Sequence, residues 1–565
     1  MEVAAQDPGV DVIVVGSGVA GMTAAIVAAC QGLKVIVLEK SDLVGGTTAF
    51  SAGAAWLPGC KHVPHEAGGI TAAYDYVANL MGERMEPELV RAYLQHGTAA
   101  LEYLEKHTCV QFRLFQGADY RTDVAGASTA GRTVDPVPFD DRRLGKLHKL
   151  IRPPMPWMTL FHGMQTDNDD VRHLLNALHS PKSLLISARR ILKHYADLAL
   201  HGRSTRRVRG SALVAMLLRA AVDRGVEVRT GAACQRLLSG ERRISGVEFL
   251  QGGQLHTLLA RRAVVLAAGG FSANAQMRQS HAASPALHRG LPPATNVGDG
   301  VRMAGAAGAE LGKDNFSDYC LTPVSCYTQS NGEELRFPHF LQDRCKPGAI
   351  AVGASGRRFV NEGCSYHDFT LAMQRAGAVP AFLIADHAFV RKYGLGMARP
   401  FPFPIRSFLR NGYLTRAATL QQLAAALGID GEALEATVGR VNDMAQTGID
   451  LEFGKGHDAY SRSHGDPRHG PNPCLGPIGR GPFYAIRLYP GDTGTTCGLV
   501  ANASAQVLDS QRQPIEGLYA CGMDMNNPTK GVHPSSGCNI GPAMAFGYIA
   551  AMHIATTLRA RSEMA

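Results

Sequence analysis

A glycine-rich turn near the start of the chain has the residue types that hold a dinucleotide. Residues 16–21 have the G-x-G-x-x-G spacing, and Glu39 closes the next apolar run. Gly16 permits the tight turn, Gly18 lets the backbone approach a pyrophosphate, and Gly21 lets the next helix pack on its strand. A carboxylate such as Glu39 accepts from the ribose hydroxyls. The predicted chemistry is dinucleotide binding.

The elements around this turn must position it. Residues 12–15 form an apolar, β-branched run typical of a buried parallel strand, and residues 22–30 form an Ala-rich helical stretch. A second apolar strand covers residues 35–38. A helix N-terminus offers free N–H groups and a partial positive charge to phosphates. A glycine fingerprint alone is weak evidence, but here the strand, the helix and the acid agree.

Three more glycine-containing segments are typical of ligand contacts. Residues 45–48 form a Gly-Gly-Thr-Thr turn that is followed by small residues at 51–54. This pattern favours a flavin cofactor over a nicotinamide cofactor. The alternative is an ordinary glycine-rich turn without a ligand. A buried strand at 263–271 ends in glycines, and residues 295–300 place Asn and Asp beside glycines as a helix cap. Near the end of the chain, residues 531–544 form a glycine-rich turn that opens a helix to about residue 558.

Length and composition restrict the class of protein. The 565 residues are 45% apolar and 19% charged, which predicts a globular chain of more than one domain. No transmembrane segment and no signal peptide are expected. Twelve cysteines lack metal-site spacing, which predicts free thiols in a cytoplasmic protein. Nothing suggests a metal, a covalent flavin or a nicotinamide site.

The net charge of +9 is concentrated in one window. Residues 142–209 contain fourteen Lys and Arg against four Asp, so the rest of the chain is close to neutral and nucleic-acid binding is not expected. Within this basic insertion, residues 183–200 predict a helix with basic residues between apolar ones. Two alternatives stay open: contact with the inner face of an anionic membrane, or packing on the protein itself or on another subunit. The predicted apolar face comprises Leu184, Ala188, Ile191, Leu192 and Tyr195.

The order of these motifs resembles that of the FAD-dependent 3-ketosteroid dehydrogenases, which belong to the flavoprotein superfamily of fumarate reductase and succinate dehydrogenase. The shared segments are the first glycine fingerprint, residues 45–51, 358–366 and 517–544. The resemblance implies an α/β fold, in which a Rossmann-type FAD-binding domain is built from both chain ends and an α+β catalytic domain is inserted. We therefore expect the FAD-binding domain to cover 1–320 and 481–565 and the catalytic domain to cover 321–480, where the sequence becomes irregular and rich in Pro and aromatic residues.

The sequence predicts further elements within these ranges. Residues 255–259 and 263–271 are expected to form separate strands, and helical segments are expected over 415–447. Residues 490–498 are expected to form a Gly- and Thr-rich turn, and Tyr484, which precedes it, is expected to be structural.

The resemblance also implies an activity, the 1,2-desaturation of a 3-oxosteroid. In the family a tyrosinate removes the proton α to the ketone while hydride leaves the β carbon for flavin N5, and a tyrosine hydroxyl and a backbone N–H hold the enolate oxygen. The base must ionise well below the free tyrosine pKa of about 10, by means of neighbouring donors. The implied partners are a small apolar ketone and an artificial or quinone-like electron acceptor, with non-covalent FAD as the cofactor.

Five catalytic positions follow from the resemblance. Tyr366 matches the base, Tyr120 matches its supporting tyrosine, and Gly537 matches the backbone donor. His533 stands where the family has the carbonyl-binding tyrosine, so the chain departs from the family pattern there. Ser535 offers a second donor. For Tyr120, Tyr366 and His533 the alternative is a purely structural role.

Two other activities stay open. One is a Δ4-(5α)-3-ketosteroid dehydrogenase, since those enzymes also use hydroxyl groups in this region. The other is reduction of an activated alkene of the fumarate or urocanate type, but residues 532–543 contain no arginine to clamp a carboxylate. A non-catalytic flavin-binding protein that uses the basic insertion at a membrane surface is a further alternative.

The predicted FAD contacts come from both chain ends. They are Gly16, Gly18, Ala20, Gly21, Glu39, Lys40, Gly45, Gly46, Thr47, Thr48, Ser51, Gly53, Ala54, Cys234, Ala268, Gly269, Asp299, Gly522, Asp524, Asn539 and Ile540.

Overall fold

The first forty residues form a strand, a helix and a second strand, as the apolar pattern predicts. In the computed structural model, which describes residues 9–563 except 178, 241–242 and 342, these are β1 (Val10–Val15), α1 (Val19–Cys30) and β2 (Val35–Leu38). The helix begins three residues earlier than predicted, because Gly18 is already its extended N-cap residue. The first turn of α1 therefore lies directly beside the glycine turn.

These strands lie in the middle of an eight-stranded sheet. Its main path runs β10-β2-β1-β13-β12-β11, and β21 joins β13 while β20 pairs with β21. The pairs β10–β2, β2–β1, β1–β13 and β13–β21 are parallel. Strand β13 combines two runs that were predicted as separate strands, because its first half pairs with β12 and its second half with β1 and β21. The bounds are β10 (Glu227–Arg229), β11 (Ala233–Ser239), β12 (Ile244–Gln251), β13 (Gln254–Leu266), β20 (Gln506–Leu508) and β21 (Pro514–Ala520).

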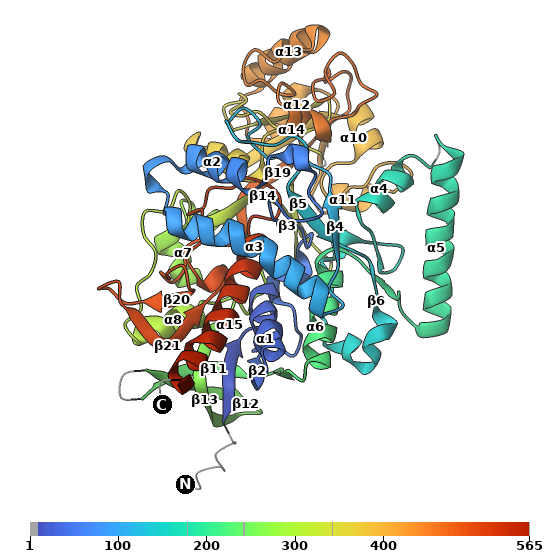
Figure 1. Cartoon of the computed structure of the whole chain (residues 1–565). Coiled ribbons are helices and arrows are strands. Elements are labelled where there is room, and N and C mark those ends of the chain that lie inside the picture. Colours follow the sequence, from blue (N-terminus) through green and yellow to red (C-terminus); the bar gives the residue numbers. More distant parts are fainter. Residues whose placement is uncertain (1–8, 178, 241–242, 342, 564–565) are drawn as a thin grey trace.

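The two ends of the chain pack together around this sheet. The last helix, α15, contacts α1 and α3, and α6 packs on the other side of α1 (Figure 1). This confirms the predicted Rossmann-type domain built from both chain ends. The helices of this domain are α2 (Gly69–Met81), α3 (Pro87–His107), α6 (Arg209–Asp223), α7 (Ala275–His281), α8 (Asp299–Ala306) and α15 (Ile540–Glu563).

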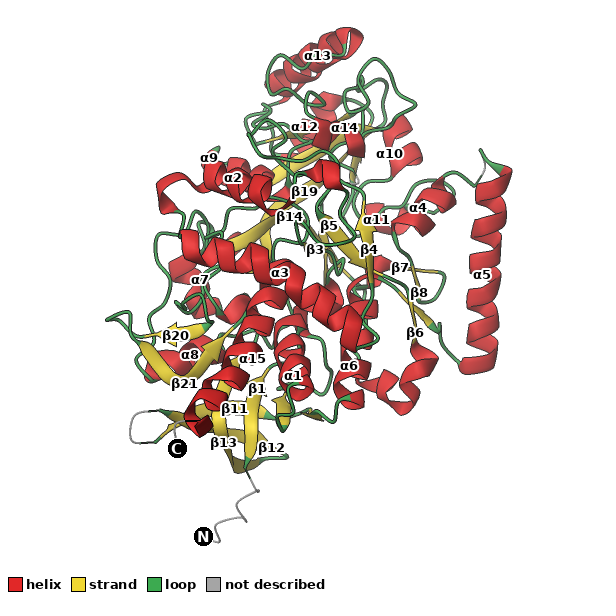
Figure 2. Ribbon diagram, viewed as in Figure 1, coloured by secondary structure: helices red, strands yellow, loops and turns green. Residues whose placement is uncertain are grey.

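A second, six-stranded sheet forms the inserted domain (Figure 2). Its order is β15-β14-β19-β17-β16, with β18 paired to β19. Alternate residues face opposite cores: Ala349 and Ala351 pack into one, and Ile350 and Val352 into the other, as the two-residue period of a strand requires. The strands are β14 (Tyr319–Thr328), β15 (Glu334–Pro338), β16 (Ala349–Val352), β17 (Ala381–Asp386), β18 (Thr415–Ala417) and β19 (Phe483–Thr495).

Helices cover both faces of the second sheet. They are α9 (Tyr366–Arg375), α10 (His387–Tyr393), α11 (Arg406–Arg410), α12 (Leu420–Leu427), α13 (Gly431–Thr447) and α14 (Ala459–His464). The helices expected over residues 415–447 are thus present as α12 and α13.

The boundary at residue 480 differs from the structure. Strand β19 pairs with β14 and β17 inside the second sheet, so the chain returns to the first domain only after Thr495. The Gly- and Thr-rich stretch from Pro490, predicted as a turn, instead continues this strand to Thr495. Glycine content alone suggested a turn, whereas pairing with β14 keeps the backbone extended as far as Thr495.

Small strands connect the domains. A three-stranded sheet, in the order β3-β5-β4, supports the loop that carries Tyr120, and two-stranded ribbons join β6 to β9 and β7 to β8. The bounds are β3 (Ala55–Trp56), β4 (Phe112–Phe115), β5 (Thr133–Pro136), β6 (Phe139–Asp140), β7 (Thr159–Leu160), β8 (Met164–Gln165) and β9 (Arg206–Arg207).

The basic insertion forms a lobe with the helices α4 (Asn168–Leu175) and α5 (Pro181–His201), and α5 stands at the edge of the molecule (Figure 1). The side chain of Ser180 accepts from the backbone N–H of Ser183, Pro181 occupies the first turn, and Gly202 ends the helix in a left-handed conformation. Sequence analysis located this helix correctly.

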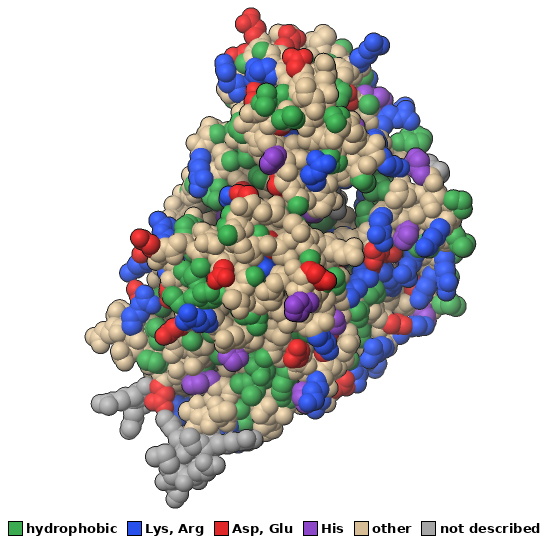
Figure 3. All heavy atoms as spheres, turned by 45° about the horizontal axis from the view of Figure 1, so that its top comes forward, with side chains coloured by type: hydrophobic (Ala, Val, Ile, Leu, Met, Phe, Trp, Pro, Cys, Tyr) green, Lys and Arg blue, Asp and Glu red, His purple; other side chains and the backbone are tan. Residues whose placement is uncertain are grey.

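The face of α5 that packs on the protein is not the apolar one. Leu184 is 53% exposed and Leu192 is 70% exposed, whereas Ser187 and His194 are buried. The alternative in which the apolar face packs on its own chain is therefore wrong. The reason is that Nε2 of His194 lies 2.7 Å from the Phe161 carbonyl oxygen, so polar positions anchor the helix. Figure 3 shows basic and apolar side chains together on this lobe.

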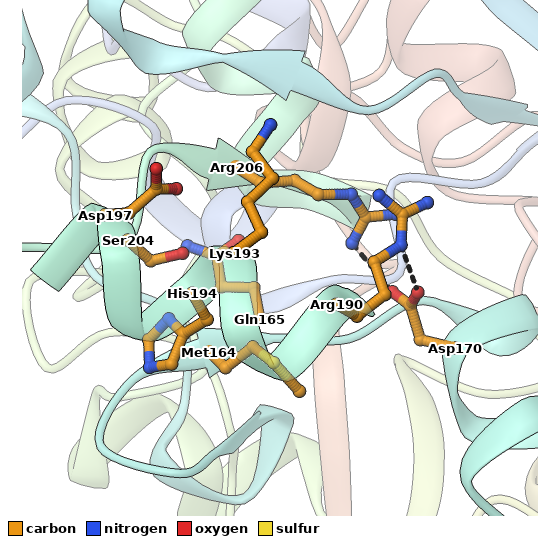
Figure 4. Close-up of a pocket in the computed structure, with 9 residues that line it drawn as sticks. All are labelled: Met164, Gln165, Asp170, Arg190, Lys193, His194, Asp197, Ser204 and Arg206. Atoms are coloured by element: carbon orange, nitrogen blue, oxygen red, sulfur yellow. Dashed lines mark hydrogen bonds and ion pairs between the residues drawn. The ribbon is translucent and has the colours of Figure 1, made fainter. Parts of the chain in front are cut away.

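A small polar pocket lies under α5. It has a volume of about 340 Å³, and in it Asp170 pairs with Arg190 at 3.3 Å and with Arg206 at 2.7 Å (Figure 4). Because these charges compensate each other, the ion pairs of Asp170 with Arg190 and Arg206 stabilise the lobe. Among the described residues, no helix is long and apolar enough to cross a membrane.

Candidate active site

The turn between β1 and α1 has the geometry that a dinucleotide requires. Gly16 has φ +107°, and a Cβ there would collide with the Ala267 carbonyl oxygen, so only glycine fits. No side chain caps α1 at Gly18, and the Val19 N–H donates to Oγ1 of Thr48 at 3.0 Å. Thr48 thus takes up the first N–H of α1, and an anionic ligand would be held by the N–H groups that follow it.

Glu39 is fixed at the end of β2. Its carboxylate accepts from the Ser17 hydroxyl at 2.5 Å and from the Ser41 N–H at 2.9 Å. The Ser17 hydroxyl in turn accepts from the Gly45 N–H at 3.0 Å, which connects the glycine turn to the second glycine loop. Three segments predicted to contact the cofactor therefore converge at the carboxyl ends of β1 and β2, where dinucleotides bind in open α/β sheets.

A second group joins the amino-terminal and carboxy-terminal parts of the domain. The Asp524 carboxylate accepts from the backbone N–H of Ala268 at 2.6 Å and of Gly270 at 3.0 Å, and burial raises its pKa to about 6. Lys40 pairs with Asp299 at 2.8 Å. These contacts hold β13, β21 and the loop after β2 in one cradle.

Cys234 and residues 51–54 are further predicted contacts, and their surroundings are defined. Cys234 is buried, and burial, followed by the charges of Asp299 and Glu39, raises its pKa to about 12. Residues 51–54 lie against the start of α6, because the Gly210 N–H donates to the Ser51 carbonyl at 3.1 Å. A cavity of about 300 Å³ is lined by residues that include Thr495, Gly522, Met523, Asn526, Asn539, Pro542 and Ala543. An uncapped helix start, an acid at the ribose position and an open cavity are the features that FAD needs, so the residues present fit this cofactor.

Three aromatic side chains from distant segments meet beside this cradle. The ring centroids of Tyr366 and His533 are 5.0 Å apart, those of Tyr120 and Tyr366 are 5.8 Å apart, and those of Tyr120 and His533 are 5.4 Å apart. The Tyr366 hydroxyl lies 3.5 Å from Nε2 of His533. The three predicted side chains therefore form one cluster.

Local structure fixes each member of this tyrosine–histidine cluster (Tyr120, Tyr366 and His533). Tyr366 is the first residue of α9, and the Ser365 side chain caps that helix by accepting from the Asp368 N–H at 3.0 Å. The Tyr120 N–H donates to the Pro534 carbonyl at 2.9 Å, so the loop bearing Tyr120 is tied to the residue that follows His533. These contacts fix the backbone at Tyr120 and Tyr366.

Burial keeps the cluster uncharged. Burial, and then the neighbouring Tyr120, raises the pKa of Tyr366 well above its ordinary value. Burial, and then the neighbouring His367, lowers the pKa of His533 well below its ordinary value. The expectation that neighbouring donors lower the pKa of Tyr366 is therefore not met by this chain, because burial disfavours the phenolate and the neighbouring Tyr120 raises the pKa further.

The two serines of the closing motif have different surroundings. Ser535 donates to the buried carboxylate of Asp119, which also accepts from Trp56 Nε1 at 2.9 Å. Ser536, which was not predicted, lies 3.1 Å from the Tyr120 hydroxyl. Gly537 has φ +89°, and a Cβ there would collide with the Trp56 N–H, so the turn requires glycine. The proposed role of Ser535 stays a prediction, since its hydroxyl is engaged away from the three rings.

An aromatic wall extends from Tyr366. The ring of Phe340 lies 4.9 Å from that of Tyr366, and Trp157 of the basic lobe lies 6.4 Å from Phe340 and 5.5 Å from Phe337. The nearby guanidinium of Arg344 is already occupied, since it donates to the carbonyl of Glu362 at 2.6 Å and of His339 at 2.7 Å. The wall is thus apolar, and the Arg344 guanidinium is engaged by backbone carbonyls.

Two residues that the sequence analysis did not assign also belong to this region. Asn296 donates to Oγ1 of Thr47 at 3.0 Å and to the Gly269 carbonyl at 2.8 Å, and its place in the segment 295–300, before two glycines, was a usable signal. Cys320 lies with its sulfur 3.3 Å from Nε2 of His533. It occurs in an ordinary apolar strand, and no local pattern identifies it.

Comparisons with known proteins agree with this geometry. A family model described as FAD binding domain matches residues 11–540. The 4-oxocyclohex-2-ene-1-carboxylate 5-dehydrogenase of Sinomonas cyclohexanicum is 36% identical, over 98% of this chain and 95% of that protein. The 3-oxosteroid 1-dehydrogenase of Mycobacterium tuberculosis is 34% identical, over 96% of this chain and 98% of that protein.

A solved structure is also similar over the full length. The 3-ketosteroid delta1-dehydrogenase from Sterolibacterium denitrificans, in complex with 1,4-androstadiene-3,17-dione, has a TM-score of 0.90 and 34% identity, and the match covers 97% of this chain and 99% of that one. The resemblance inferred from the motifs is therefore confirmed, and FAD is the cofactor. This chain belongs to the FAD binding domain family, as an FAD-dependent oxidoreductase related to the 3-ketosteroid dehydrogenases.

Proposed function

We propose that this protein desaturates a 3-oxosteroid or a similar cyclic ketone, and that Tyr366 is the base. The observation that supports this most directly is the tyrosine–histidine cluster, in which a phenol and an imidazole lie 3.5 Å apart beside the cofactor cradle. FAD, when bound, accepts the hydride in this chemistry. The chain itself must then take up one proton and stabilise one developing negative charge.

Each step has a residue in the proposal. Tyr366, as the phenolate, removes the proton α to the ketone, and Tyr120 stabilises the negative charge that the Tyr366 oxygen carries before this transfer. His533 and the backbone N–H of Gly537 donate to the enolate oxygen. Such donors act most strongly in a buried site, because they are held in place before the charge develops. The role of Tyr484 stays structural, since its hydroxyl lies 3.1 Å from Nδ1 of His387.

The class of substrate follows from the aromatic wall. Phe340, Phe337 and Trp157 give an apolar surface beside Tyr366, which suits a large neutral ring system. Reduction of a dicarboxylate such as fumarate needs a free guanidinium, and Arg344 is engaged by backbone carbonyls. A small oxocyclohexene acid, the substrate named for the Sinomonas relative, is the principal competitor.

A panel of substrates tests this proposal. The purified holoenzyme is assayed with an artificial electron acceptor on androst-4-ene-3,17-dione, a 5α-reduced 3-oxosteroid, 4-oxocyclohexanecarboxylate and, with a reduced donor, fumarate. We expect the highest kcat/KM on a 3-oxosteroid, with a new double bond at carbons 1 and 2. A higher kcat/KM on the oxo acid would assign the small substrate, and a product unsaturated at carbon 4 would assign the Δ4-(5α) activity. Fumarate reduction without ketone oxidation would contradict the proposal.

We also propose that α5 contacts an anionic membrane surface. Leu185, Leu192 and Leu200 are 71%, 70% and 77% exposed, and Arg189 and Lys193 lie between them. Exposed leucines beside basic side chains on one helix fit the boundary between headgroups and acyl chains. A membrane would also supply an apolar substrate and a quinone-like acceptor.

Vesicle sedimentation tests this contact. We expect the protein to bind phosphatidylglycerol vesicles more strongly than phosphatidylcholine vesicles, and Leu185→Gln with Leu192→Gln to weaken that binding. Leu451→Gln, which changes an exposed leucine of the other domain, is the matched control. Unchanged binding by the double variant, or a dimer in light scattering that the double variant dissociates, would contradict the membrane proposal.

A further inference from the structure

Cys320 occupies the centre of the site, although no sequence motif includes it. It is the second residue of β14 and is 1% exposed. Its sulfur lies 3.3 Å from Nε2 of His533, and its thiol also has side-chain hydrogen bonds with Thr493 and Asn539. Asn539 lines the cavity of the cofactor cradle. One thiol thus joins the imidazole of the tyrosine–histidine cluster to the cofactor side of the site.

The same ring nitrogen faces two groups. Nε2 of His533 lies 3.3 Å from the Cys320 sulfur and 3.5 Å from the Tyr366 hydroxyl. Nδ1 of His533 has no hydrogen-bond partner among the described residues. Nε2 is therefore the nitrogen through which this histidine acts on the reacting atoms.

Protonation restricts what each group can do. Burial raises the pKa of Cys320 to about 11, and burial lowers the pKa of His533 well below its ordinary value. At neutral pH the thiol is protonated and the imidazole carries one N–H. The titratable groups that face this imidazole are Cys320 from β14, Tyr366 and His367 from α9, and Tyr120 from its loop.

We propose that Cys320 is a positioning residue, whose sulfur holds the Nε2–H of His533 toward the ketone oxygen beside Tyr366. This rests on the proposed function. Sulfur is a weak acceptor, so it keeps the imidazole in one tautomer and one orientation, yet a ketone oxygen displaces it at little cost.

Three variants separate positioning from packing. Cys320→Ala removes the contact, Cys320→Ser keeps a polar atom, and Cys326→Ser changes a cysteine elsewhere on β14 as the control. We measure kcat and KM on androst-4-ene-3,17-dione over a range of pH, the melting temperature, and the binding of 1,4-androstadiene-3,17-dione from the perturbation of the flavin spectrum. The last measurement requires no turnover.

We expect Cys320→Ala to lower kcat by about tenfold or more with KM within about twofold, because the donor acts mainly in the transition state. The acidic limb of the pH profile of kcat should also shift in Cys320→Ala, and Cys320→Ser should retain most of the wild-type kcat. If Cys320→Ala retains kcat and the pH profile, or if Cys320→Ser loses as much as Cys320→Ala, the proposal is overturned. A wild-type protein that binds the dienone but oxidises no ketone would contradict only the proposed function, and the binding of the dienone by the variants would then decide the role of Cys320. Failure to bind any 3-oxo compound would overturn both.

Discussion

The cofactor cradle and the tyrosine–histidine cluster are assembled in opposite ways. The core of the cradle is local: β1, the glycine turn, α1 and Glu39 follow one another within thirty residues. The cluster joins a loop, the start of α9 and a turn near the end of the chain, so Tyr120 and His533 are separated by more than four hundred residues. The core of the cradle is thus one continuous segment, to which Asp299 and Asp524 add distant contacts, whereas the chemistry depends on the relative position of two domains.

The largest effect is expected from Gly16→Val, which breaks only the cradle. A Cβ at this position collides with the Ala267 carbonyl oxygen, and φ is +107°. We expect the loss of bound flavin together with destabilisation of at least about 3 kcal/mol, because both the strain and the contact oppose the fold. The ratio of flavin to protein absorbance measures the first, and denaturant unfolding measures the second.

Gly439→Ala is the control for this change, since Gly439 lies on α13 with open space around it. Retention of flavin by Gly16→Val would show that the turn is not the binding site.

The second-largest effect, a loss of turnover, is expected from substitution of His533, which belongs to the tyrosine–histidine cluster and not to the cofactor cradle. His533→Ala should lower kcat by about a hundredfold and retain the flavin, because one donor to the enolate oxygen is lost. His533→Tyr restores the hydroxyl of the family and should retain more activity than His533→Ala. Steady-state rates and flavin content check both changes.

The pH dependence of the wild-type rate has a definite sign. Burial raises the pKa of Tyr366 and lowers that of His533. Raising the pH therefore increases the phenolate fraction, while the imidazole is already neutral, so kcat should rise between about pH 6 and pH 9. A rate that falls over this interval would contradict a phenolate base.

The extent to which the sequence predicts these regions follows from the same contrast. The strand, turn and helix from Val10 to Cys30 are recognisable locally, because glycine spacing and apolar runs reflect local backbone geometry. The contact of Cys320 with His533 joins residues 213 positions apart, and no local pattern predicts it. For α5, the apolar spacing identified a helix, but the buried contacts of His194 determine which face packs.

The domain boundary illustrates the same limit. The glycines after Pro490 suggested a turn, yet the pairing of β19 with β14 extends the strand to Thr495. Strand pairing between distant segments is tertiary information, and it overrides local turn preference.

The smallest effect is expected at Asp524, which joins the two parts of the cradle. Its pKa of about 6 in the folded protein exceeds the ordinary value of 3.8, so the protonated form is favoured by folding. The stabilisation that the protonated Asp524 carboxyl gives to the fold is complete below pH 3.8 and is lost as the pH rises through about 6. Asp524→Asn should remove this part of the pH dependence and cost about 1–2 kcal/mol near neutral pH, since an amide cannot accept from both backbone N–H groups.

Denaturant unfolding of the wild type and of Asp524→Asn at several pH values measures this difference. Parallel stability curves for the two proteins would show that the Asp524 carboxyl does not titrate in this range.

Anaerobic bleaching of the flavin tests the central claim most directly, because it isolates the half-reaction of Tyr366. Wild-type protein mixed with androst-4-ene-3,17-dione without oxygen should lose its yellow absorbance, and Tyr366→Phe should retain FAD yet bleach slower by about 10²–10⁴. Tyr484→Phe, which alters a tyrosine outside the cluster, should bleach at the wild-type rate. Equal bleaching by wild type and Tyr366→Phe would contradict the account, because the base would then lie elsewhere.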